Sequence, residues 1–138
     1  MTMILTITKR LRMSRGQTLQ FTEIIRDADT SLPLDLTGKR VHWVMRADMK
    51  CAPIVVLTSQ SPLPAGWRAG VEILVQSGIT LGKYRVTVIP ADTEDLVALG
   101  ASDPWLHESW VESADETERQ PHITTSILDL DPQVLDPP

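Results

Sequence analysis

The chain has 138 residues, of which 42% are apolar and 22% charged, and its formal net charge is −5. That length is typical of one domain, and the ordinary apolar fraction argues against a largely disordered chain. The single cysteine, Cys51, excludes an internal disulfide framework and any metal site built from several cysteines. No apolar run approaches the ~20 residues of a membrane-spanning helix. Met1–Thr6 lacks the basic region of a secretory signal, so we expect synthesis in the cytoplasm and no membrane partner.

Charge is unevenly distributed along the chain. Residues 1–69 carry a net charge of +5, and residues 70–138 carry −10. Such asymmetry can mark a nucleic-acid surface on the basic half. No basic helix or aromatic–basic motif accompanies it, and the sequence pI is about 5.1. We therefore expect the two halves to neutralise each other within one fold, with no nucleic-acid partner.

The chain divides into short segments, punctuated by ten prolines and seven glycines. Alternating or β-branched apolar residues predict strands at residues 4–13, 19–25, 41–46, 54–58, 71–75, 84–88, 105–111 and 123–130. The one helical signal is Pro90–Leu96, which has acids in its first turn and is followed by a stop at Gly100. Glu112–Glu118 is expected to be an acidic hairpin tip.

This pattern predicts an all-β fold, a sandwich or small barrel of about seven or eight strands with one short helical turn. The period-two phase places seven side chains in a shared core. They are Leu19, Phe21, Val41, Trp43, Tyr84, Val86 and Val88.

Catalytic and metal-binding patterns are weak. The histidines His42, His107 and His122 do not have the spacing of a zinc site. No nucleophile elbow surrounds any serine, and Cys51 is interpreted as a spectator thiol. A calcium site at Asp27, Asp29 and Asp35 is a weaker alternative to ordinary Asx turns. We therefore predict no catalytic residue, no metal and no cofactor.

The four tryptophans stand out beside one phenylalanine and one tyrosine. Trp43 has the phase of a core residue. Trp67 and Arg68 follow a glycine and suit a protein contact, because Trp and Arg are enriched at interfaces. Trp105 and Trp110 lie near Glu108 and Glu112, a combination that also occurs in carbohydrate sites. Two further contact residues, Val134 and Leu135, lie in the proline-rich C-terminal segment.

Five segments follow the order of a known domain family. They are Arg15–Thr22 (R-G-Q-T-L-Q-F-T), Asp27–Asp29, Leu34–Gly38 (L-D-L-T-G), Val41–Arg46 and Pro90–Leu96 (P-A-D-T-E-D-L). In this order they resemble the small Ig-like domain of tailed-bacteriophage structural proteins, related to the N-terminal domain of the baseplate upper protein family. The resemblance covers residues 12–100. It differs at Gln17, where the family has an acid.

The resemblance implies an Ig-like antiparallel β-sandwich over residues 1–128. It also implies a non-enzymatic component of a tailed-phage virion, in the tail, the baseplate or an appendage attachment, made in the bacterial host cytoplasm. The partners would be other virion proteins and copies of the chain itself. Three alternatives remain: a capsid decoration protein, a carbohydrate- or receptor-binding module using Trp67, Trp105 and Trp110, and a hydrolase using Glu108 or Glu112.

The last ten residues, 129–138, are expected to form an extended arm. Their prolines disfavour a central strand and favour an extended conformation that loses little entropy on docking. Val134 and Leu135 offer an apolar anchor between acids. We expect a neighbouring subunit to hold this arm.

Overall fold

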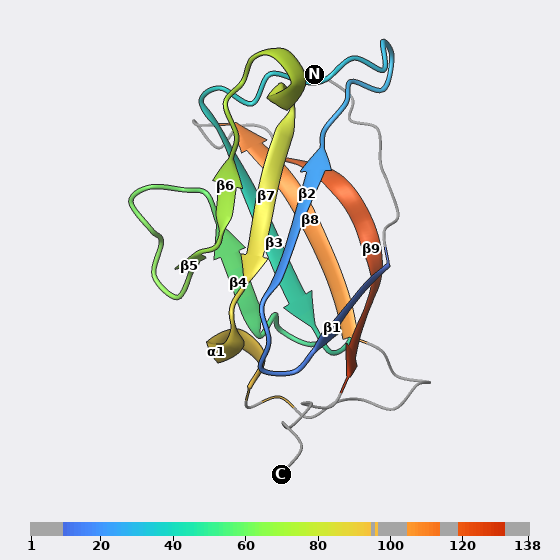
Figure 1. Ribbon diagram of the computed structural model, residues 1–138, viewed down its shortest axis with the longest axis vertical. Helices are drawn as coiled ribbons and strands as arrows, with labels where there is room; N and C mark the ends of the chain where they lie inside the picture. Colours follow the sequence, from blue (N-terminus) through green and yellow to red (C-terminus); the bar gives the residue numbers. More distant parts are fainter. Residues whose placement is uncertain (1–9, 95, 97–104, 114–118, 132–138) are drawn as a thin grey trace.

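The computed structural model describes residues 10–94, 96, 105–113 and 119–131. These residues form nine strands, one short α-helix and one 3-10 turn (Figure 1). In chain order the elements are β1 (Leu11–Ser14), β2 (Leu19–Ile24), β3 (Lys39–Arg46), β4 (Val55–Thr58), β5 (Arg68–Ala69), β6 (Val71–Ile73), η1 (Gly78–Thr80), β7 (Lys83–Val88), α1 (Pro90–Thr93), β8 (Trp105–Ser113) and β9 (Arg119–Asp131). The mostly β class predicted from the alternating pattern is confirmed.

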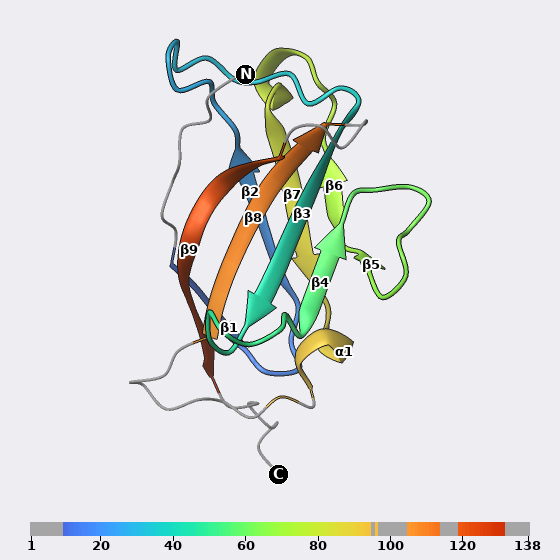
Figure 2. The same ribbon diagram turned by 180° about the vertical axis from the view of Figure 1, so that it is seen from behind.

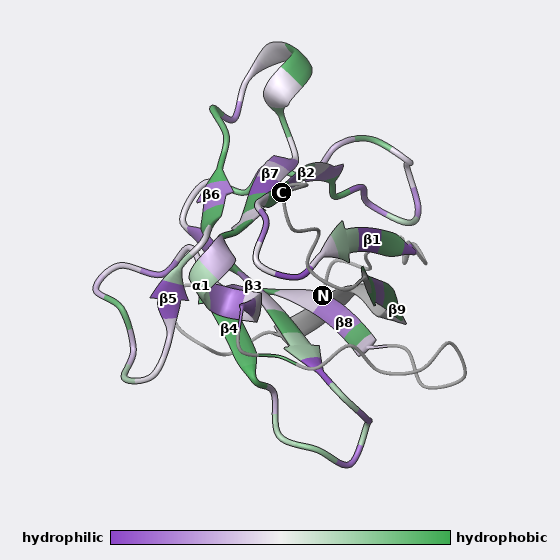
Figure 3. Cartoon of the chain, turned by 60° about the horizontal axis from the view of Figure 1, so that its bottom comes forward, coloured by the Kyte–Doolittle hydropathy of each residue, from purple (hydrophilic) through white to green (hydrophobic). Residues whose placement is uncertain are grey.

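The strands form two sheets that face each other across the core. One is a six-stranded mixed sheet with the order β1-β9-β8-β3-β4-β5, and the other is a three-stranded antiparallel sheet with the order β2-β7-β6. Figure 2 shows the six-stranded sheet from its outer side. Along β7, buried and more exposed residues alternate, as expected where one face of a sheet is buried, and Figure 3 shows the hydropathy of each strand.

The expected plain antiparallel sandwich is corrected in two respects. First, β1 pairs with β9 in parallel, with Leu11 opposite Leu128, and β4 pairs with β5 in parallel. Second, the described strands number nine rather than seven or eight, because the two-residue strand β5 was not predicted. Segments this short carry no readable period.

The helical segment predicted at Pro90–Leu96 is confirmed over Pro90–Thr93, which form α1. Pro90 occupies its first turn, where the missing N–H costs nothing. The Asp92 carboxylate accepts a hydrogen bond of 2.8 Å from the backbone N–H of Ile89, which caps the helix. The helix thus begins directly after β7 and turns the chain away from the three-stranded sheet.

The core contains all seven residues expected there. Six of them are buried, and Leu19 packs against the core while partly exposed. Trp43 is fully buried and meets Phe21 edge-on, with their ring centroids 6.2 Å apart. The two rings come from β3 and β2, so this contact joins the two sheets.

Polar side chains also cross the core. Trp43 Nε1 donates to His107 Nδ1 at 3.2 Å, and the Tyr84 hydroxyl lies 3.0 Å from Ser109 Oγ. Because Tyr84 lies on β7 and Ser109 on β8, the second contact links the two sheets. Glu23, which is opposite Tyr84 in the β2–β7 register, is also buried. Burial raises the pKa of the Tyr84 phenol well above its ordinary value.

Asp129, Leu130 and Asp131, with which the expected arm begins, belong to β9 and pair with β1. The rest of that arm, and residues 114–118 of the expected hairpin tip, lie outside the described residues. No helix in the described part of the chain has the length and apolar character that a membrane span requires.

Candidate functional site

The outer face of the six-stranded sheet carries an unusual set of side chains. In β3, Val41, Trp43 and Met45 point into the core, so the alternate residues point to the other side. We define the outer face by the outward residues of three neighbouring strands together with Trp67. They are Arg40, His42, Val44, Arg46, Val56, Thr58, Leu106, Glu108, Trp110 and Glu112.

His42 occupies the middle of this face. It lies between Thr58 on β4 and Trp110 on β8, which are its partners in the two strand registers. Its Nδ1 lies 2.8 Å from Thr58 Oγ1, and its ring centroid lies 5.1 Å from that of Trp110. His42 is only 4% exposed although it points away from the core.

Trp67 covers His42 from the connection between β4 and β5. A turn closed by a 3.2 Å hydrogen bond from the Trp67 N–H to the Pro64 carbonyl brings the indole back onto the sheet. Gly66 makes this turn possible with its φ of +85°. The Trp67 ring centroid lies 5.2 Å from that of His42 and 6.1 Å from that of Trp110. We call these three residues the aromatic cluster.

Two ion pairs flank the aromatic cluster along the strands. Arg40 Nη2 lies 3.0 Å from Glu112 Oε1, and Arg46 Nη2 lies 2.6 Å from Glu108 Oε1. The four side chains are only 14–24% exposed. Both arginines come from β3 and both glutamates from β8. The charges therefore form a positive column beside a negative one, with no net charge among the four.

The structure brings together two of the predicted contact residues. Trp67 and Trp110 meet in the aromatic cluster. Trp105, expected at a contact surface, lies instead in the core with 6% exposure. The reason is parity: Trp105 and Trp110 are five positions apart on one strand, so they point to opposite sides of the sheet.

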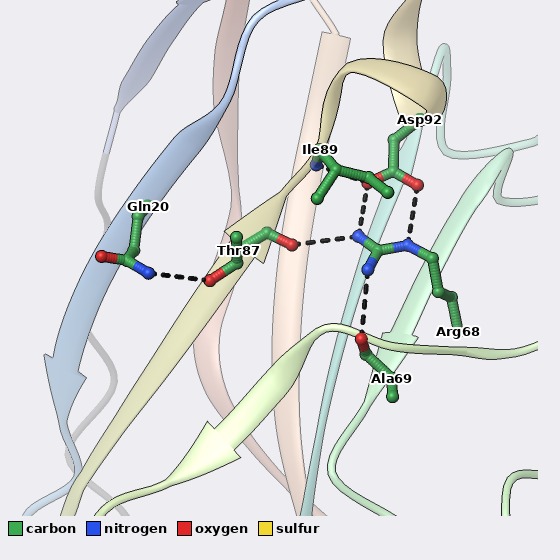
Figure 4. A network of polar contacts seen from close by, with 6 residues as sticks. All are labelled: Gln20, Arg68, Ala69, Thr87, Ile89 and Asp92. Atoms are coloured by element: carbon green, nitrogen blue, oxygen red, sulfur yellow. Dashed lines mark hydrogen bonds and ion pairs between the residues drawn. The ribbon is translucent and has the colours of Figure 1, made fainter.

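Arg68, predicted as a contact residue, is held by hydrogen bonds within the fold. Its Nε donates to Asp92 Oδ1 at 2.9 Å and its Nη2 to the other oxygen of the same carboxylate. Nη2 also donates to the carbonyl of Thr87, and Nη1 to that of Ala69 (Figure 4). In the same view, Gln20 donates to the Thr87 hydroxyl. Arg68 thus ties the end of β7 and α1 to β5.

A cavity of about 400 Å³ lies beside this ion pair, lined in part by Arg68, Gly70 and Glu72. A Cβ on Gly70 would lie 2.9 Å from a methyl group of Leu57 and 3.1 Å from Arg68 Nη2. A side chain at this position would therefore require the Leu57 and Arg68 side chains to shift. Because Asp92 already neutralises Arg68, the cavity offers no free cation for an anionic ligand.

The aspartates considered for calcium are occupied by local turns. Asp27 Oδ1 accepts hydrogen bonds from the N–H groups of Asp29 and Thr30. Asp35 Oδ1 accepts from the N–H and the hydroxyl of Thr37, and these bonds lower the pKa of Asp35 below its ordinary value. Within the described ranges, no three His, Cys, Asp or Glu side chains form a group that could hold a metal ion.

The remaining predicted contact residues, Val134 and Leu135, lie outside the described residues. The glutamates considered for hydrolysis are each held by an arginine, Glu108 by Arg46 and Glu112 by Arg40. Both carboxylates are therefore engaged in ion pairs within the sheet. The geometry suits binding, because two partly exposed indoles lie on one face of the sheet and are bordered by paired charges.

Sequence reasoning missed Arg40, Arg46 and Thr58, which contact Glu112, Glu108 and His42 respectively. It also missed the central position of His42. A signal was present in β3, where period two places Arg40, His42 and Arg46 on one face. Comparisons with known protein families and with curated proteins find no match for this chain.

Proposed function

We propose that this chain is a non-enzymatic structural component of a tailed-bacteriophage virion, in the tail, the baseplate or an appendage attachment. It acts through protein–protein contacts made by the outer face of the six-stranded sheet. The observation that carries the contact role is the pairing of Trp67 with Trp110 beside two Arg–Glu pairs. Interfaces are enriched in aromatic residues and arginine.

The virion assignment rests on the resemblance of residues 12–100. The motifs behind it are structural contacts in this fold. Arg15 Nη1 donates to the carbonyl of Leu96 at 2.8 Å, and the Gly16 N–H donates to Thr93 Oγ1 at 2.9 Å. The turn before β2 therefore contacts the α1 segment. These hydrogen bonds connect the first motif of the resemblance, Arg15–Thr22, to the last, Pro90–Leu96. Such motifs specify the fold.

The strand order supports a more specific fold, an Ig-like domain of variable type. In that type, a sheet of strands B, E and D faces a sheet containing G, F, C, C′ and C″. The order β2-β7-β6 fits the former, and β9-β8-β3-β4-β5 fits the latter. A buried tryptophan on strand C is a hallmark, and Trp43 on β3 fits it. Phe21 and His107 contact Trp43 from the strands that carry the disulfide in antibody domains.

This function is tested on purified particles of the phage that encodes the chain. Mass spectrometry should find the chain as a particle component, and a labelled antibody should bind the tail or baseplate in electron micrographs. The variant Trp110→Arg should be incorporated poorly. Its control, Arg85→Glu on the outer side of the three-stranded sheet, should be incorporated normally. Absence of the wild-type chain from particles contradicts the proposal.

The same particles separate the alternatives. Label over the capsid shell favours a decoration protein. A carbohydrate module predicts saturable heat on titration with sugars, and the burial of Trp105 removes one of its three expected aromatic residues.

A further inference from the structure

We propose that the outer face of the six-stranded sheet packs against the same face of a second copy of this chain, about a two-fold axis. The inference rests on the proposed function, since it names one partner of the proposed contact face. Two features of that face carry it: its charge pattern and its aromatic centre.

The charge pattern is self-complementary. On the outer face, β3 carries positive charge at Arg40 and Arg46, and the neighbouring β8 carries negative charge at Glu108 and Glu112. A two-fold axis between these strands and parallel to them places β8 of one copy over β3 of the other. Each positive column then faces a negative column. A face with a uniform charge could not pair with itself in this way.

Neutrality of this face matters because the whole chain carries a net charge of −5. Two copies repel each other through most of their surfaces, and like charges placed against each other cost affinity. The two ion pairs add no net charge, so they avoid this penalty. Both pairs are already largely screened from water, at 14–24% exposure, which reduces the desolvation cost of a further contact.

The same axis brings the aromatic centres together. Trp110 is opposite His42 in the β3–β8 register, so rotation about this axis brings Trp110 of the second copy to the aromatic cluster of the first, where Trp67 covers His42. Trp67 borders the same position, with its ring centroid 6.1 Å from that of Trp110. Binding energy in interfaces concentrates in central aromatic residues surrounded by contacts that exclude water.

Sedimentation velocity on the full chain tests the proposal. We expect a concentration-dependent dimer at micromolar to ~100 µM chain. Trp110→Ala should raise the dimer Kd at least about 30-fold, the loss typical of a central anchor. The matched control Arg85→Ala, on the outer side of the three-stranded sheet, should leave the Kd unchanged. Circular dichroism confirms that each variant is folded.

A charge-swap pair gives an independent result. One variant carries Arg40→Glu and Arg46→Glu, and the other carries Glu108→Arg and Glu112→Arg. Each should be monomeric alone, and an equimolar mixture should form heterodimers. If either double variant is unfolded, the single swaps Arg46→Glu and Glu108→Arg are mixed instead, with the same expectation.

A wild-type chain that stays monomeric at ~100 µM overturns this inference. So does a dimer that survives Trp110→Ala or that Arg85→Ala disrupts. The proposed function fails separately: a monomeric chain found in particles removes only the two-fold contact, whereas a dimer absent from particles removes the virion role.

Discussion

The guanidinium of Arg68 binds both carboxylate oxygens of Asp92, and this ion pair connects the β5 edge of the six-stranded sheet to α1, the helix that follows β7. Asp92 also caps α1 by accepting from the Ile89 N–H. The Asp92 side chain is 11% exposed and that of Arg68 32%. The Asp92 carboxylate therefore stabilises both the N-terminus of α1 and the contact between α1 and β5.

Replacing Asp92 by Asn should lower the free energy of unfolding by about 1.5–3 kcal/mol, because a largely buried charged hydrogen-bond acceptor is lost. Urea unfolding followed by circular dichroism measures the change. The control Glu72→Gln alters an exposed acid 3.8 Å from Arg85, and should change stability by no more than about 0.5 kcal/mol. Equal effects of the two substitutions would show that the Arg68–Asp92 pair is an ordinary surface contact.

Gly82 and Gly78 form a matched pair for a backbone prediction. Both have positive φ, +79° and +59°, but a Cβ on Gly82 would lie 2.8 Å from the Ile25 carbonyl oxygen, whereas a Cβ on Gly78 meets nothing within 4 Å. Gly78→Ala should lower the free energy of unfolding by about 1 kcal/mol, because alanine disfavours the left-handed backbone conformation. Gly82→Ala should lower it by at least about 2 kcal/mol, because the backbone must also move to accommodate the Cβ atom. Thermal unfolding of both variants tests this difference, and equal costs contradict it.

Trp43 should be the most sensitive core position. Trp43→Ala removes a fully buried indole that contacts Phe21 and donates to His107, so unfolding should become easier by about 3–5 kcal/mol. Leu32→Ala, at a side chain that is 64% exposed, serves as the control and should be nearly neutral. A Trp43→Ala protein as stable as the wild type would rule out the core described above.

The lowered pKa of Asp35 predicts that the stability of the fold depends on pH in acid. Two hydrogen bonds from Thr37 lower the pKa of its carboxyl below 3.8 in the folded chain. The folded state therefore binds fewer protons than the unfolded state near that pH, and the stabilisation is lost as pH falls through the folded pKa. Asp35→Asn should be less stable than the wild type near neutral pH, and the gap in Tm should close in acid. A gap that is independent of pH contradicts this assignment.

The fold could be predicted where each strand is long enough to show its period. Trp43 and Phe21 were placed in the core by alternation alone. β5 was missed because two residues have no period, and the parallel pairing of β1 with β9 depends on contacts between distant segments. Alternation within a segment reports which face is buried, but it carries no information about which strand lies beside it.

The candidate site was predicted less well than the core. Composition singled out Trp67 and Trp110, but Trp105 and Arg68 were grouped with them although they lie elsewhere. Parity along β8 separates Trp105 from Trp110. The role of Arg68 depends on Asp92, which is 24 residues away, and no local pattern announces such a pair.

Hydroxyl-radical footprinting at increasing chain concentration tests the central claim, that the outer face of the six-stranded sheet is a contact surface. Oxidation of Trp67 and Trp110 should fall as the chain self-associates. Ile79, which is 87% exposed on the connection between β6 and β7, should stay equally reactive, and the buried Trp43 should stay protected throughout. Unchanged oxidation of Trp67 and Trp110, or protection confined to Ile79 and the three-stranded sheet, would contradict the claim.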